Sequence, residues 1–143
     1  MQGLKSQRLR FSVSRFETGD FTGAEQAYKN LLPLLSADRR SPVTEKLLAA
    51  IYRQGEVAEE ADETDVAIGH YLRLAAIDAD NEIAVRGTFD AVALKEKGGD
   101  TEGAAQLLKD LRTRHANHAL LKEANVHLAS LYEQSGDSIQ AAA

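Results

Sequence analysis

A short motif recurs along this chain and limits its possible folds more than any other feature does. The motif reads Gly-Asp-x-x-Gly-Ala at residues 19–24 and 99–104, and Gly-Asp-Ser-Ile-Gln-Ala at residues 136–141. A degenerate copy begins at residue 67. The aligned alanines, which are spaced by 43, 37 and 37 residues, are Ala24, Ala67, Ala104 and Ala141. Self-similarity at such a period indicates a protein built from stacked repeats.

Each repeat is expected to contain two helices joined by a short turn. The chain has only 2 prolines and is rich in alanine and leucine, which favours helix. Valine and isoleucine never alternate over the length of a strand, so we expect no β-strand. The expected helices span residues 4–17, 21–35, 42–60, 64–77, 82–97, 101–115 and 118–134.

Turn residues define the ends of these helices. A left-handed residue is expected at the first glycine of each motif, at Gly19, Gly99 and Gly136. The expected N-caps are Asp20, Ser41, Asn81 and Asp100. Pro42 would then occupy the first helical position. The longer first interval would be due to extra loop residues at 36–42.

Small and large apolar residues alternate on the second helix of each repeat. Alanine is expected where two helices cross closely, at Ala24, Ala67 and Ala104. One turn further along the same face, a large side chain is expected to fill the core, at Tyr28, Tyr71 and Leu108. These stripes are interpreted as core packing and not as a cofactor site.

Composition excludes several classes of protein. The 143 residues carry a net charge of −5 with both signs mixed, so nucleic-acid binding is not indicated. Cysteine is absent, which excludes disulfides and thiol chemistry. No run approaches the roughly 20 apolar residues that a membrane span requires.

The residues of the later repeats resemble the tetratricopeptide repeat (TPR) family. The stretch AIGHYLRLAAIDADN, residues 67–81, resembles the second helix and exit turn of a TPR. Leu128, Ala129 and Tyr132 stand at signature positions of a first helix, although Asn125 replaces the usual aromatic residue. The resemblance implies an all-α fold, a right-handed α-α superhelix (solenoid) of about seven helices.

A period of 37 residues is longer than is usual for this family. Together with residues 114–124, it resembles the long-period TPR proteins of the bacterial envelope, although the usual proline of that exit segment is missing. The resemblance therefore implies a periplasmic or envelope-associated protein, with a cytoplasmic one as the alternative.

The chain is expected to form a single array over residues 1–143. The repeats span residues 4–36, 42–79 and 82–116, with a partial fourth repeat at 118–143. The last helix would present Leu121, Leu128, Leu131 and Tyr132 without a following helix to cover them. We therefore expect either a fragment of a longer protein or a homodimer through this open C-terminal end.

A TPR superhelix binds its partners on a concave face lined by the first helix of each pair. Transferred to this chain, the resemblance implies that the groove residues are Leu9, Val13, Tyr52, Glu56, Arg86, Phe89, Ala93, Val126 and Ser130. Leu9 and Val13 stand where a chaperone carboxylate clamp has polar residues, so we do not expect that function. The expected function is a protein-interaction scaffold that binds a peptide or protein subunit. The alternative is a structural spacer or self-association segment with no peptide ligand.

No catalytic, cofactor-binding or metal-binding residues are predicted, and we do not expect an enzyme. His115 and His118 are three residues apart, but they have no third ligand close in sequence. The acidic run between Glu56 and Asp65 lacks the glycine and the ligand order of an EF-hand. No phosphate-binding glycine loop is present.

Overall fold

The computed structural model describes residues 2–120, 123 and 126. Within them the chain forms six α-helices and one 3₁₀ turn and contains no strand, which confirms the all-α prediction. The elements are α1 (Gln2–Glu17), α2 (Phe21–Leu31), η1 (Leu32–Leu34), α3 (Ala37–Glu60), α4 (Thr64–Asp78), α5 (Glu82–Lys97) and α6 (Thr101–Arg114). None of the helices in this part of the chain has the length and apolar character that crossing a bilayer requires.

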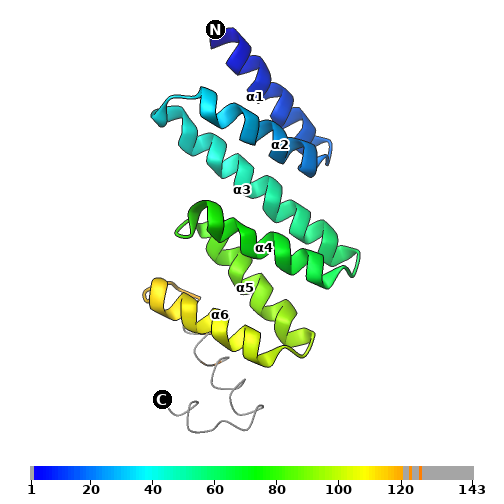
Figure 1. Ribbon diagram of the computed structural model, residues 1–143, viewed down its shortest axis with the longest axis vertical. Coiled ribbons are helices and arrows are strands. Elements are labelled where there is room, and N and C mark those ends of the chain that lie inside the picture. The colour runs from blue at the N-terminus through cyan, green and yellow to red at the C-terminus, as the bar shows by residue number, and fades with distance from the viewer. Residues whose placement is uncertain (1, 121–122, 124–125, 127–143) are drawn as a thin grey trace.

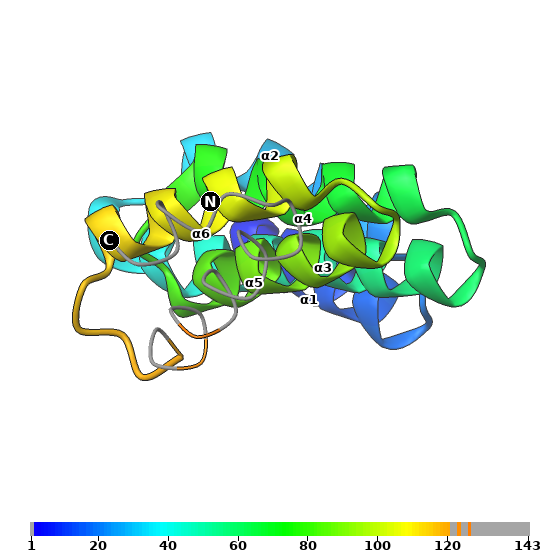
Figure 2. The same ribbon diagram turned by 90° about the horizontal axis from the view of Figure 1, so that it is seen from below.

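The helices stack in the order in which the sequence presents them. Each one packs mainly against the helix before it and the helix after it (Figure 1). Seen along the stack, α1, α3 and α5 form one layer and α2, α4 and α6 form a second (Figure 2). Within the first layer, α3 and α5 are also in contact. The architecture is that of a helical-repeat protein.

The turns between paired helices follow the motif. Gly19 and Gly99 adopt left-handed φ angles of 87° and 90°, as predicted. The carboxylates of Asp20 and Asp100 each accept a hydrogen bond from the backbone N–H three residues on, at 3.0 and 2.9 Å. Each of these two motifs therefore ends one helix and caps the next, and Asn81 caps α5 by accepting from Ile83 N–H.

The degenerate copy makes the same turn with less suitable residues. Asp62 stands where the other turns have glycine, and its φ is 59°. A left-handed conformation is strained for a residue with a side chain, by roughly 1–2 kcal/mol for most residues and less for Asp. Glu63 occupies the N-cap of α4 without a side-chain hydrogen bond. This turn is the least favourable of the three.

An Asp62→Gly variant is expected to be more stable than the native protein. Removing the left-handed strain should raise the free energy of unfolding by about 0.5–1 kcal/mol, after the entropy that glycine adds to the unfolded chain. Urea unfolding followed by circular dichroism would measure the change. Gly99→Ala is the matched control, because it introduces the same strain and should lower stability by about 1 kcal/mol. A loss of stability in Asp62→Gly would contradict this account of the turn.

The prediction for the start of the third helix was wrong. This helix begins at Ala37, and Ser36 has the extended backbone of an N-cap, with φ −69° and ψ 160°. Ser41 and Pro42 therefore lie inside α3, where Pro42 is the sixth residue and cannot donate a backbone hydrogen bond to the carbonyl of Asp38. The additional residues of the first interval lengthen α3 to 24 residues, against 16 in α5, instead of forming a loop.

The core includes the predicted stripes. Ala24, Ala67 and Ala104 are fully buried at the helix crossings, and the large residues four positions on are at most 2% exposed. Both parts of the packing prediction are confirmed.

The segment after α6 differs from the prediction over the residues that the structure describes. Helix α6 ends at Arg114, and residues 118–120 lie in a turn and not in the first turn of a helix over 118–134. Apart from Glu123 and Val126, which are helical, the remainder of that helix and of the partial fourth repeat lies outside the described residues. The open end and the homodimer proposed for it stay predictions.

Candidate partner-binding face

The predicted groove residues within residues 2–120 all lie in the layer of α1, α3 and α5. Leu9, Tyr52 and Phe89 are equivalent, because each precedes the left-handed residue of its turn by ten positions. Each is partly buried and packs against a core cluster with one side of its side chain. The three form a row of large residues that crosses the layer from helix to helix.

A second row lies one turn further along the helices. It contains Val13, Glu56 and Ala93, of which Val13 and Glu56 are partly buried and Ala93 is exposed. Val126 continues the first row by its spacing and is 73% exposed, but its neighbours lie outside the described residues, as does Ser130.

A pocket of about 250 Å³ opens between α3 and α5, at the C-terminal end of α3. Tyr52 and Tyr71 form its aromatic part, with ring centroids 5.3 Å apart. Since Tyr71 comes from α4 and is only 1% exposed, it forms the floor. The full lining is Tyr52, Glu56, Glu59, Glu60, Tyr71 and Asp90.

Both tyrosine hydroxyls donate to carboxylates of this pocket. Tyr52 Oη donates to Asp90 Oδ2 at 2.5 Å, and Tyr71 Oη donates to Glu59 Oε1 at 2.9 Å. Burial, followed by these hydrogen bonds, raises the pKa of both tyrosines above its ordinary value. The hydroxyls therefore remain protonated donors at neutral pH.

The pocket is negatively charged. Burial, together with the nearby charges of Glu59 and Glu56, raises the pKa of the Asp90 carboxyl, against the opposing effect of the Tyr52 hydrogen bond and of Arg86. Arg53 Nη1 pairs with Glu56 Oε1 at 2.7 Å near the surface and neutralises part of this charge. A buried carboxylate next to other carboxylates is destabilising, and such arrangements are enriched at functional sites.

The pocket brings together only some of the predicted groove residues. Tyr52 and Glu56 line it, and Arg86 is close enough to influence the pKa of Asp90. Leu9 and Val13, on α1, do not line it. Phe89 turns instead toward His118, with ring centroids 5.9 Å apart.

Sequence reasoning did not find four of the six lining residues. Glu59 and Glu60 belong to the acidic run for which no binding role was predicted, and Tyr71 was interpreted as core packing. Asp90 is one residue from the predicted Phe89 and one turn from Arg86, so its charge inside an apolar stretch was the signal that could have found it.

His118 follows α6 outside any helix, yet its side chain is largely buried. Its side chain is 16% exposed and packs on Phe89. Nδ1 accepts a hydrogen bond from Leu120 N–H, so Nε2 carries the proton and donates to the Glu82 carboxylate at 3.0 Å. This histidine fixes the segment after α6 against α5.

No protein-family model matches this chain, and no curated protein matches it. The TPR resemblance therefore stays a prediction. Within the described part of the chain, no group of three or more His, Asp or Glu side chains is arranged to hold a metal ion.

Proposed function

We propose that this chain is a protein-interaction scaffold of tetratricopeptide type, and that it binds an extended or helical segment of a partner protein on the layer of α1, α3 and α5. The observation that carries the proposal is the anionic pocket between α3 and α5, which opens beside the row of large residues that includes Tyr52. The likeness of residues 114–124 to long-period envelope proteins supports a place in a bacterial envelope assembly.

The chemistry of the pocket favours a lysine or arginine side chain of the partner. Carboxylates can accept hydrogen bonds from the charged end of such a side chain, and the partly buried Tyr52 ring can contact its methylene groups. A hydrogen bond to a charged group contributes about 1.5–3 kcal/mol, enough for a dominant contact in an otherwise weak interface. Apolar side chains on either side of the basic residue would lie along the row of Leu9, Tyr52 and Phe89.

Selection from a random peptide library tests the proposal. The protein is immobilised, and enriched peptides are expected to contain a lysine or arginine next to apolar residues. Affinities are then measured by fluorescence anisotropy. Asp90→Asn should weaken binding about tenfold, because the amide keeps the shape of the side chain and its bond from Tyr52 but removes the charge. Glu102→Gln, an exposed carboxylate on α6, is the matched control and should leave binding unchanged.

Asp90→Asn should have opposite effects on binding and on stability. Because the pKa of Asp90 is raised, its charged form is disfavoured in the folded protein, and Asp90→Asn is expected to raise the thermal midpoint while it weakens binding. Affinity should also fall as the pH is lowered through the raised pKa. A library that yields no enriched peptide, or peptides insensitive to Asp90→Asn, would favour the structural spacer.

A further inference from the structure

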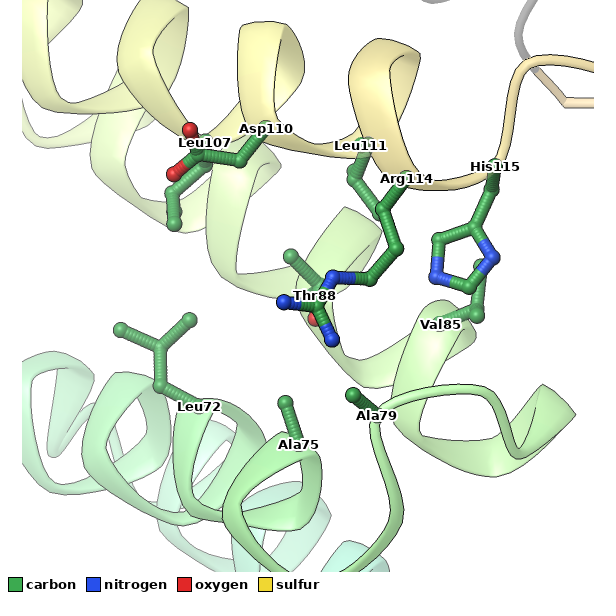
Figure 3. Close-up of a pocket in the computed structure, with 10 residues that line it drawn as sticks. All are labelled: Leu72, Ala75, Ala79, Val85, Thr88, Leu107, Asp110, Leu111, Arg114 and His115. Atoms are coloured by element: carbon green, nitrogen blue, oxygen red, sulfur yellow. The ribbon is translucent and has the colours of Figure 1, made fainter.

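A second pocket lies in the other layer of the molecule. It has a volume of about 370 Å³, which is within the range of small-molecule sites, and it opens between α4 and α6 over α5 (Figure 3). We call this space the second seam, and the equivalent space between α2 and α4 over α3 the first seam. The apolar part of the pocket is formed by Leu72, Ala75, Ala79, Val85, Leu107 and Leu111.

The first seam shows why the second seam is hollow. The repeat places Leu32, Leu48 and Ile51 at the first seam. Leu48 and Ile51 are fully buried there, and Leu32 packs against the same core cluster. The equivalent residues of the second seam are all smaller, and they are Ala75, Val85 and Thr88. The cavity therefore results from three specific residues and not from the helix arrangement.

The polar connection across the first seam is also missing from the second. In the first seam Glu25 of α2 forms an ion pair with Arg73 of α4. The equivalent residues of the second seam are Ile68 and Asp110, which cannot form an ion pair. Asp110 accepts a hydrogen bond from Gln106 on its own helix, at 3.2 Å. Within residues 2–120, no such bridge closes the mouth of the pocket.

One end of the pocket is cationic. Arg114 and His115 line it at the C-terminal end of α6, and the Arg114 side chain extends from that helix into the pocket region (Figure 3). Within residues 2–120 no hydrogen bond or ion pair holds this guanidinium. Thr88 Oγ1 donates to Ala84 O, so the hydroxyl can act only as an acceptor toward a ligand. The donors that face the pocket are thus Arg114 and His115.

From these features we propose that the second seam binds a small amphipathic carboxylate, a medium-chain alkanoate in chemical class. The alkyl chain lies in the apolar part of the pocket, against Leu72, Leu107 and Leu111. The carboxylate accepts hydrogen bonds from Arg114, whose planar guanidinium matches it, and from His115. This site is on the opposite layer from the peptide-binding pocket, so the two can be tested separately.

Isothermal titration of the whole chain with decanoate, below its micelle concentration, tests the proposal. We expect saturable binding at one site, and binding of decanol at least tenfold weaker. Arg114→Gln should weaken decanoate binding at least tenfold, while Arg112→Gln, an exposed change on the same helix that does not line the pocket, should leave it unchanged. Equal binding of decanol, or an unchanged affinity in Arg114→Gln, would overturn the assignment.

A second variant tests the cavity itself. Ala75→Leu combined with Thr88→Ile introduces the side chains that fill the first seam. This double variant should lose decanoate binding and unfold at a higher temperature than the native protein. Retained binding in a folded double variant would show that decanoate binds elsewhere. Absence of saturable decanoate binding to the native protein would also overturn the proposal, with no consequence for peptide binding.

Discussion

Replacing Arg73 with methionine is expected to lower the free energy of unfolding by about 3 kcal/mol at neutral pH. Arg73 of α4 holds Glu25 of α2 with two hydrogen bonds, of 2.7 and 2.8 Å. The Glu25 side chain is only 10% exposed, and it is also bound by Lys29 at 2.6 Å and by Gln54 of α3 at 2.7 Å. The network around Glu25 therefore joins three helices, and the loss of Arg73 leaves a buried carboxylate with weaker partners.

The effect of Arg73→Met should depend on pH in a defined direction. The hydrogen bond from Arg73 is the largest cause that lowers the pKa of Glu25 from 4.5 to about 2. Because the folded-state pKa is depressed, the stabilisation is complete above the unfolded pKa and is lost as the pH falls from about 4.5 to about 2. Urea unfolding of both proteins should therefore show a difference that is large at pH 7 and small near pH 2.

The double variant Glu25→Leu/Arg73→Met is the control for this result. It removes both charges and should recover part of the stability that Arg73→Met loses, because no buried carboxylate remains. If Arg73→Met loses the same amount of stability at pH 7 and at pH 2, the loss would come from packing of the arginine stem and not from the ion pair.

The Tyr71→Ala variant is expected to have the second large effect, and it should lower the free energy of unfolding by about 3–5 kcal/mol. Tyr71 is 1% exposed, and its ring lies on Tyr52 and fills the space where a Cβ of Gly55 would otherwise lie. Alanine would leave a cavity at the junction of α3, α4 and α5. Chemical unfolding followed by circular dichroism would measure the loss.

Tyr71→Phe is the matched control, because it keeps the ring and removes only the hydroxyl. It should lower stability by about 1 kcal/mol, since Glu59 is exposed and can bind water instead. If Tyr71→Phe were as unstable as Tyr71→Ala, the hydrogen bond to Glu59 and not the ring would dominate this junction.

The sequence predicted the helices better than it predicted the site. Helix ends were predictable where the chain itself marks them, as at Gly19 and Asp100, because a left-handed glycine and an N-cap act locally. The start of α3 was missed, because Ser-Pro is a typical start signal, whereas Pro42 is the sixth residue of this helix and its loss of one backbone hydrogen bond does not break it.

The pocket depends on contacts that no local pattern encodes. Tyr52 and Asp90 are 38 residues apart, and their hydrogen bond exists only because α3 and α5 are neighbours in one layer. Gly55 was missed for a related reason. A glycine in the middle of a helix indicates only a weak helix former in the sequence, whereas Gly55 is required because the Tyr71 ring of α4 occupies the space beside it.

The unequal seams also determine how this array would respond to mechanical load. Each helix is held mainly by its neighbours in the chain, and contacts across the seams, such as the ion pair between α2 and α4, add to this, so a force applied to the two ends loads both seams in series. The first seam is closed by a charged clamp and by large apolar side chains, whereas the second seam has a cavity in the same place. The stack would therefore separate first between α4 and α6. A ligand bound in the second seam would contact both helices and raise the force needed to separate them.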